Sequence, residues 1–184
     1  MEIDKTWTLF LDRDGVINKK RENDYVKNWK EFSFIKGSLE AISFLSKVFG
    51  KIIIVTNQRG VGRGIMKEED LILIHQRMSD QIELNFGKID KIYYCTDVSD
   101  LSSNRKPNPG MGLQALSDFP EINFEKSIMI GDSQSDILFG HNLGMNCFLV
   151  LDTQNTFNHN KNCVKSLYEF SKLLSVFNPT SKIE

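Results

Sequence analysis

Short apolar stretches alternate along the chain with longer segments in which apolar residues recur at helical spacing. The short stretches predict five strands, over Trp7–Leu11, Ile52–Val55, Ile89–Cys95, Ser127–Ile130 and Cys147–Leu151. The second stretch is β-branched and apolar at every position, which is typical of a strand buried on both faces of a parallel sheet.

The segments between and after these strands predict five helices. They span Ser38–Val48, Lys67–Asn85, Pro109–Phe119, Ser133–Leu143 and Lys165–Phe177. Regular alternation of strands and helices predicts a parallel sheet covered on both faces, and right-handed crossovers make this a doubly wound α/β fold. We expect the 184 residues to form a single domain over residues 1–184.

Composition and charge exclude several classes of partner. The 23 basic and 24 acidic residues give a net charge of −1, without the basic excess of a nucleic-acid-binding protein. No apolar run approaches the roughly 20 residues that cross a membrane, and the polar N-terminus is unlike a targeting peptide. The cysteines Cys95, Cys147 and Cys163 lie far apart and predict no disulfide framework. We therefore expect a cytoplasmic protein without nucleic-acid or membrane partners; the sequence makes no prediction of an oligomeric state.

Polar residues follow four of the predicted strands. They are Asp12-Arg13-Asp14-Gly15, Thr56-Asn57-Gln58, Arg105-Lys106 across a loop, and Gly131-Asp132 with Asp136 one helical turn later. Each group alone is ordinary turn or helix-cap chemistry. Since ligands of open parallel sheets bind beyond the carboxyl ends of the strands, the four groups together predict an active site at that edge.

These residues suit phosphoryl transfer. Asp12, Asp14 and Asp132 would crowd negative charge onto one edge, which a hard cation such as Mg²⁺ relieves. A carboxylate such as Asp12 can attack phosphorus and form an aspartyl-phosphate. Lys106 and the Thr56 hydroxyl suit the phosphoryl oxygens, and Asp14 can act as acid and base.

In these motifs the sequence resembles the phosphatases of the haloacid dehalogenase (HAD) superfamily. The resemblance is carried, in order, by Asp12-Arg13-Asp14-Gly15-Val16, Thr56-Asn57, Lys106, and Gly131-Asp132 with Asp136, and covers about residues 7 to 151. It implies a Rossmann-like fold without a large cap. It also implies that Asp12 is nucleophile and metal ligand, and that Asp14 is acid and base with its backbone carbonyl on the metal. Asp132 would be a further ligand, and Asp136 would support the metal or orient Lys106.

Within the superfamily the chain is similar to a small capless group that acts on heptose 1,7-bisphosphate and on histidinol phosphate. Segments 10–18, 55–58, 94–95 and 105–111 carry this likeness, and Tyr25-Val26, residues 32–37 and Gly62-Arg63-Gly64 favour the heptose branch. The likeness implies that Thr56, Asn57 and Lys106 hold the transferred phosphoryl group. It implies substrate binding by Arg13, Tyr25, Asn57, Gln58, Arg63 and Arg105.

The chain departs from this group at two places. Such phosphatases often carry a zinc loop with three cysteines and a histidine after the third strand, whereas here only Cys95 precedes the loop 96–104. One thiol cannot make a structural zinc site, so we expect none. Ser133 stands where heptose phosphatases tend to have lysine.

The sequence thus predicts a Mg²⁺-dependent phosphatase acting on a small phosphorylated metabolite through an aspartyl-phosphate. D-glycero-D-manno-heptose 1,7-bisphosphate, cleaved at position 7, is the favoured substrate, and histidinol phosphate is the alternative. A non-enzyme alternative is a phospho-acceptor receiver domain. Receivers carry their acceptor Asp after the third strand, where this chain has Tyr93-Tyr94-Cys95.

Overall fold

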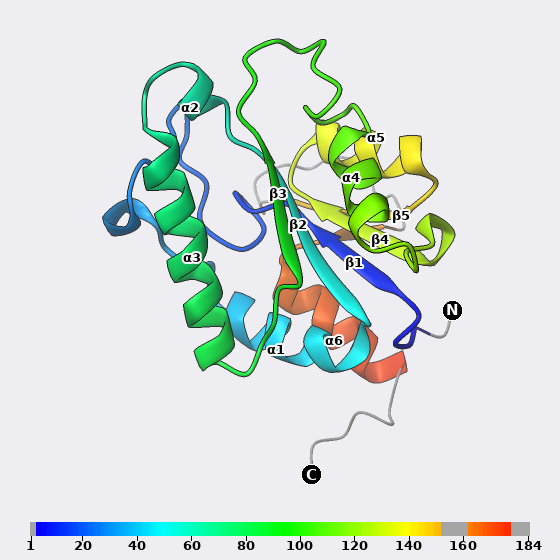
Figure 1. The fold of residues 1–184 in the computed structure, drawn as a ribbon. Coiled ribbons are helices and arrows are strands. Elements are labelled where there is room, and N and C mark those ends of the chain that lie inside the picture. The colour runs from blue at the N-terminus through cyan, green and yellow to red at the C-terminus, as the bar shows by residue number, and fades with distance from the viewer. Residues whose placement is uncertain (1–2, 152–161, 178–184) are drawn as a thin grey trace.

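The structure is a computed structural model that describes residues 3–151 and 162–177. Its centre is a six-stranded parallel sheet in the order β3-β2-β1-β4-β5-β6 (Figure 1). The strands are β1 (Thr8–Leu11), β2 (Lys51–Asn57), β3 (Lys91–Cys95), β4 (Ser127–Gly131), β5 (Asn146–Val150) and β6 (Cys163–Val164). The order reverses direction between β1 and β4, and such a switch point is where doubly wound folds bind their ligands.

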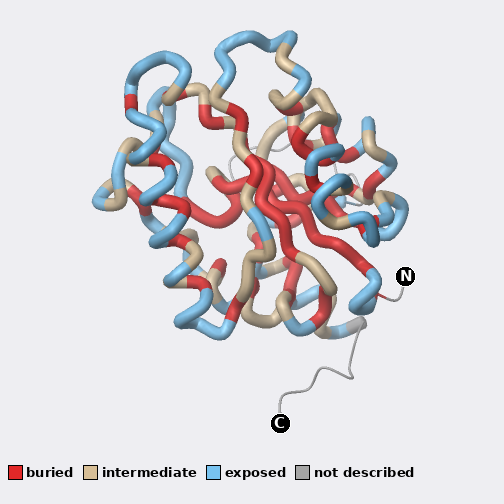
Figure 2. The backbone as a smooth tube through the Cα atoms, viewed as in Figure 1, coloured by how far each residue is buried: buried red, intermediate tan, exposed pale blue. Residues whose placement is uncertain are grey.

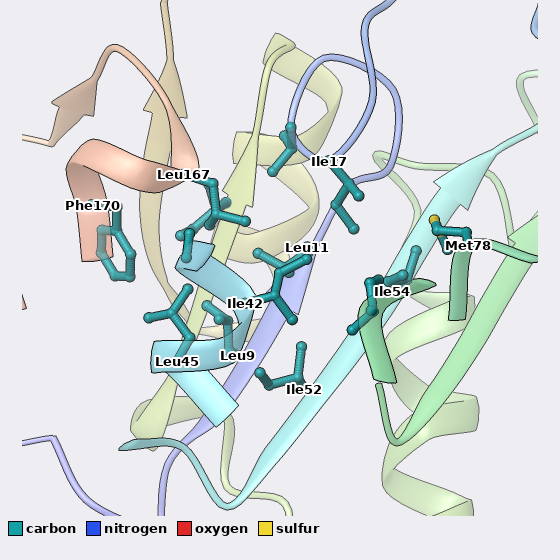
Figure 3. Packing of buried hydrophobic residues seen from close by; sticks show 14 of the residues in the cluster. Leu9, Leu11, Ile17, Ile42, Leu45, Ile52, Ile54, Met78, Leu167 and Phe170 are labelled. Atoms are coloured by element: carbon teal, nitrogen blue, oxygen red, sulfur yellow. The ribbon is translucent and has the colours of Figure 1, made fainter. Parts of the chain in front are cut away.

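Helices cover both faces of the sheet. One face packs against α1 (Ser38–Val48), α3 (Glu68–Leu84) and α6 (Leu167–Phe177), and the other against α4 (Gly110–Asp118) and α5 (Gln134–Leu143). Because side chains of a strand alternate, Leu9 and Leu11 of β1 join the first cluster and Phe10 joins the second. Figure 3 shows Leu9 and Leu11 packed with residues of α1 and α6. The predicted doubly wound α/β fold is confirmed.

The five predicted strands and five predicted helices are all present, with bounds within two residues of those expected. The sequence pattern missed the short elements α2 (Arg59–Gly62) and β6, and the 3₁₀ turns at Trp29–Glu31 and Phe124–Lys126. Elements of two to four residues are too short to show a helical or strand period. The prediction of one domain over residues 1–184 includes residues outside the described part.

The central strands of the sheet are mostly buried, and most of the exposed backbone belongs to the outer helices and the loops (Figure 2). All four residues of β1 and all five of β4 are buried. The loop that leaves β3 rises beside α2 at the top of Figure 1. None of the described helices is long and apolar enough to cross a membrane.

Candidate active site

A cavity of about 270 Å³ opens at the carboxyl edge of the sheet, beyond β1, β2 and β4. Eight of the predicted site residues line it: Asp12, Asp14, Tyr25, Thr56, Asn57, Arg105, Lys106 and Asp132. Asp136 lines it as well, together with Lys20, Arg21, Asp24, Val26, Ser133 and Ser135. The strand ends thus bring the predicted catalytic and metal-binding residues to one place.

The deepest part of the cavity is a buried triad of one cation and two carboxylates. Asp12 follows β1, and its backbone N–H donates to the Ile130 carbonyl at 2.9 Å, which ties it to β4. Lys106 Nζ lies 2.9 Å from Asp12 Oδ1 and 2.6 Å from Asp136 Oδ1. It also donates to the Val55 carbonyl at 2.6 Å. Lys106 therefore links β1, β2 and α5, which holds its ammonium against Asp12.

Burial and charge set the protonation of this triad. Burial raises the pKa of Asp12 to about 7, and Asp136 adds to the rise while Lys106 opposes it. For Lys106, burial alone would lower the pKa, but the two carboxylates outweigh burial and raise it. Lys106 therefore stays a cation, and Asp12 gains from any further positive charge placed beside it.

Asp136 owes its position to the start of α5. Ser133 caps this helix, and its hydroxyl and backbone N–H both donate to Asp136 Oδ2, at 2.6 and 3.0 Å. This capping box leaves Oδ1 for Lys106. A Cβ at Gly131 would lie 2.1 Å from the Asp136 Cβ, so only glycine lets β4 pass this close. These contacts favour the second of the two expected roles of Asp136, the orientation of Lys106.

The donor set fits a hard divalent cation. Carboxylate oxygens of Asp12, Asp132 and Asp136 all lie within 4.8 Å of one another. Gly15, at φ +86°, lets the loop after β1 approach, since a Cβ there would lie 2.2 Å from Asp132 Oδ2. Burial raises the pKa of Asp132, and the ammonium of Lys20, 2.7 Å from its Oδ2, partly offsets this. Clustered carboxylate oxygens are the ligands that Mg²⁺ takes in proteins.

The Asp14 carboxylate is held outside this oxygen cluster. Arg13 Nη2 donates to both of its oxygens at 2.9 and 2.8 Å. Asn18 Nδ2 donates to Oδ1 at 2.8 Å and Gln58 Nε2 to Oδ2 at 2.9 Å. Burial would raise the pKa of Asp14, but Arg13 and these hydrogen bonds lower it. Asp14 is thus a fixed carboxylate on the cavity wall.

Two residues expected to bind substrate lie in the interior instead. The Arg13 side chain is 0% exposed and Gln58 is 1% exposed, and neither lines the cavity. The Arg13 guanidinium forms an ion pair with Asp14. The Gln58 amide donates to both Asp14 and the Thr56 hydroxyl. The polar groups of both residues already bind other site residues, and substrate contact by either stays a prediction.

The remaining expected contacts sit at the rim. Asn57 exchanges two 3.1 Å hydrogen bonds with the Lys106 backbone and so joins β2 to the loop after β3. Arg105 Nε donates to Asp100 at 3.0 Å, and Arg59 binds the same carboxylate oxygen. Arg63 is exposed and lies off the cavity wall, with its Nη1 donating to the Tyr25 hydroxyl at 3.2 Å. Arg63 therefore meets the site only through Tyr25.

Sequence reasoning missed several contributors. Lys20 was detectable, because Lys19-Lys20-Arg21 is a basic run soon after the first motif. His75 gives a weaker signal, since it is a single polar residue on the apolar face of α3, where Leu71, Met78 and Ile82 are buried. Its Nε2 lies 3.2 Å from Arg13 Nη1.

The loop after β3 has its own polar cluster. Cys95 Sγ lies 3.6 Å from Asp97 Oδ2 and 3.9 Å from the Ser102 hydroxyl, which itself donates to Asp97. The Asn108 amide donates to the carbonyls of Asp100 and Ser102. Hydrogen bonds therefore tie this loop at several points.

A doubly wound sheet with an Asp-x-Asp pair after β1 and a buried lysine against the first Asp defines a phosphohydrolase-like α/β protein. The model of the HAD-hydrolase-like family matches residues 103–161. A D-glycero-α-D-manno-heptose-1,7-bisphosphate 7-phosphatase of Mycobacterium tuberculosis is 40% identical over 138 residues, which are 74% of this chain and 73% of the relative. The corresponding β-heptose enzyme of Vibrio cholerae is 35% identical over 153 residues, 79% of this chain and 81% of the relative.

Solved structures agree with the curated relatives. The D,D-heptose 1,7-bisphosphate phosphatase of B. bronchiseptica, complexed with magnesium and phosphate, superposes with a TM-score of 0.82 at 26% identity. The match covers 93% of this chain and 99% of that one. The chain belongs to the heptose-1,7-bisphosphate 7-phosphatase family of the HAD superfamily. The predicted superfamily and enzyme class are confirmed, and the receiver-domain alternative is set aside.

Proposed function

We propose that this protein is a Mg²⁺-dependent phosphatase that removes the phosphate at position 7 of D-glycero-D-manno-heptose 1,7-bisphosphate. The observation that carries this proposal is the buried Asp12–Lys106 pair beside Asp132, in a chain of this family. The relatives include phosphatases named for the α-anomer and for the β-anomer of the sugar, so the proposal covers the heptose without an anomer preference.

Asp12 is the nucleophile in this proposal. One of its carboxylate oxygens attacks the phosphorus, a P–O bond to Asp12 forms, and the bond to the sugar oxygen breaks. Lys106, the Thr56 hydroxyl and Asn57 lie on the cavity wall around Asp12, where they hold the phosphoryl oxygens. Bound Mg²⁺ would offset the charge between Asp12 and the phosphate; Asp12, Asp132 and the backbone carbonyl of Asp14 would hold it.

Asp14 moves the proton. Its protonated form donates to the leaving sugar oxygen, and the resulting carboxylate then takes a proton from the water that hydrolyses the aspartyl-phosphate. Phosphate leaves and Asp12 is restored. The four hydrogen bonds on Asp14 fix its carboxylate beside the cavity and favour the charged form, which suits the second step and makes the protonated form used in the first step a minor population.

The second phosphate of the substrate is bound at the rim. Arg105 and Tyr25 line the cavity, and Arg63 reaches it through the Tyr25 hydroxyl. A guanidinium can bind a phosphate through two charge-assisted hydrogen bonds. A monophosphate has no second phosphate to bind the rim in this way. We propose that these three residues favour the bisphosphate.

The loop after β3 holds its shape without zinc in this proposal. The hydrogen bonds among Cys95, Asp97 and Ser102 support it, since they tie the loop to the end of β3, and one thiol cannot make a structural zinc site. We also propose that residues 1–184 act as one domain.

A substrate panel tests the proposed function. The kcat/KM values are measured with Mg²⁺ for both anomers of the heptose bisphosphate, for small sugar monophosphates and for histidinol phosphate. We expect the bisphosphate to be preferred by about tenfold or more, as a charge-assisted contact would give. A preference for histidinol phosphate would contradict the proposed substrate. Inactivity on every phosphomonoester would contradict the proposed phosphatase activity.

A further inference from the structure

We propose that His75 is a positioning residue for this reaction, which acts through Arg13 to hold the Asp14 carboxylate in one orientation. The inference rests on the proposed function, in which Asp14 moves the proton. His75 itself touches neither the cavity nor the expected substrate, and the residue that it contacts, Arg13, is equally buried.

His75 occupies a place on α3 that packing alone would fill with an apolar side chain. Leu71, Ile74, Met78 and Ile82 are its buried companions on the helix, and His75 is only 6% exposed. A buried imidazole needs partners for its ring nitrogens. Its Nε2 finds one in Arg13 Nη1, 3.2 Å away.

The direction of this hydrogen bond is fixed by chemistry. A guanidinium can only donate, so Nε2 must accept, and the proton of the neutral ring sits on Nδ1. Burial and the neighbouring Arg13 charge both lower the pKa of His75, to about 3. At neutral pH the ring is therefore a constant acceptor for Arg13.

Arg13 carries this constraint to Asp14. One end of its guanidinium, Nη1, is anchored on His75, and the other, Nη2, donates to both oxygens of Asp14. Its Nε has no hydrogen-bond partner among the described residues. Because the Arg13 side chain is fully buried, His75 is the anchor that sets the plane of the guanidinium from the far end.

The orientation of Asp14 matters because proton transfer is sensitive to distance. Asp14 must reach the leaving oxygen from a cavity wall, and an error of about 1 Å can lower a rate by about a hundredfold. Asn18 and Gln58 also hold Asp14, but each binds a single oxygen. Arg13 alone spans both oxygens, so a tilted guanidinium turns the carboxyl group.

The competing explanation is that His75 only packs. Its ring lies 5.6 Å from that of Tyr94, centroid to centroid, so its removal would disturb the α3–β3 contact. A packing role and a positioning role make different predictions for substrates with different leaving groups.

The test compares His75→Met, which fills space but offers only a weak acceptor, with His75→Gln, whose amide oxygen can accept from Arg13. For each variant, kcat/KM is measured on the heptose bisphosphate and on p-nitrophenyl phosphate. The value of kcat/KM reports the steps up to and including departure of the leaving group. A sugar alkoxide needs a proton to leave, whereas nitrophenolate does not, so only the first substrate needs a well-placed Asp14.

We expect His75→Met to lower kcat/KM for the bisphosphate by about tenfold to a hundredfold, and for p-nitrophenyl phosphate by less than about threefold. His75→Gln should restore most of the loss. Ile82→Val, on the same helix, is the control for weakened packing and should leave the ratio of the two substrates unchanged. If His75→Met does not fold, His75→Asn replaces it. The Asn side chain is one methylene shorter than that of Gln, so its amide lies farther from Arg13.

Equal losses on both substrates, or a His75→Gln variant as impaired as His75→Met, would overturn the positioning role. Retention of the wild-type rate by His75→Met would overturn it as well. These outcomes all require an active wild-type protein, so they are distinct from failure of the proposed function, in which the wild type itself hydrolyses neither substrate.

Discussion

The floor and the rim of the cavity are built differently. The floor is made of Asp12, Thr56, Lys106, Asp132 and Asp136, and it is largely buried. Asp12, Thr56 and Asp132 lie at or directly beyond strand ends, Asp136 lies in the first turn of α5, and Lys106 follows the loop after β3. The rim, made of Tyr25, Arg63 and Arg105, stands on two loops and the end of α2. Its contacts reach groups at the surface, such as Asp100, whose side chain is 83% exposed. Buried charges interact strongly and exposed pairs weakly, so the floor should tolerate substitution far less than the rim.

The largest effect is expected at the nucleophile. Asp12→Asn keeps the shape of the side chain and removes the attacking charge, so kcat should fall by roughly a thousandfold or more. The melting temperature should stay near that of the wild type or rise, because burial already opposes the charge on Asp12. Turnover of freshly purified variant at a near wild-type rate would contradict the covalent mechanism.

Metal removal separates the floor from the loop after β3. A chelator should reduce activity by about a hundredfold or more, and Mg²⁺ should restore it, because the clustered carboxylates of Asp12, Asp132 and Asp136 need a divalent cation to accept an anionic phosphate beside them. Metal analysis of the purified protein should find no stoichiometric zinc. Zinc that is released only when the protein unfolds would show that the loop 96–104 has a metal site after all.

At the rim, Arg105→Ala tests the contact with the second phosphate. Loss of a charge-assisted hydrogen bond should lower kcat/KM for the bisphosphate by about tenfold to a hundredfold. A sugar monophosphate should lose only a few-fold, and it serves as the control on the same variant. The Asp100→Asn variant should have a smaller effect than Arg105→Ala, because Asp100 is exposed. Parallel losses on both substrates would place Arg105 with the transferred phosphate instead.

His75, which is buried beside Arg13 outside the floor, predicts a pH-dependent stability. In the folded protein the pKa of His75 is lowered to about 3, whereas in the unfolded chain it is near its ordinary value of 6.5. The unfolded state therefore binds a proton that the folded state does not, and stability falls as the pH drops below about 6.5. Between pH 7.5 and 5.5 the wild type should lose about 1 kcal/mol more of unfolding free energy than His75→Gln, measured by urea titration. Equal losses in the two proteins would show that His75 titrates normally when folded.

The same contrast explains what the sequence could predict. The floor was predictable, because the strand period and the polar residue after each strand together place Asp12, Thr56 and Asp132 at one edge. The burial of the Arg13 side chain was not predictable from the sequence. Its partner His75 lies 62 residues away, and the two residues meet only in the folded protein. The rim depends on loops without a period, so neither the Arg59–Asp100–Arg105 cluster nor the place of Arg63 off the cavity wall could be inferred from residue type.

The smallest effect is expected at Arg63. The size of this effect shows how far from the floor residues still contribute to selectivity for the bisphosphate. Arg63 contacts the Tyr25 hydroxyl at 3.2 Å and does not itself line the cavity, so it acts on substrate through a neighbour unless the substrate is long enough to reach it. Arg63→Ala should therefore lower kcat/KM for the bisphosphate by about threefold to fivefold, less than Arg105→Ala, and leave a small monophosphate unchanged. Tyr25→Phe, which removes the hydroxyl and keeps the ring, is the matched variant. If Arg63 works through that hydroxyl, Tyr25→Phe should reproduce the loss and the double variant should add nothing to it. Additive losses would mean that Arg63 meets the second phosphate directly, and the rim would then extend beyond the cavity wall to the end of α2.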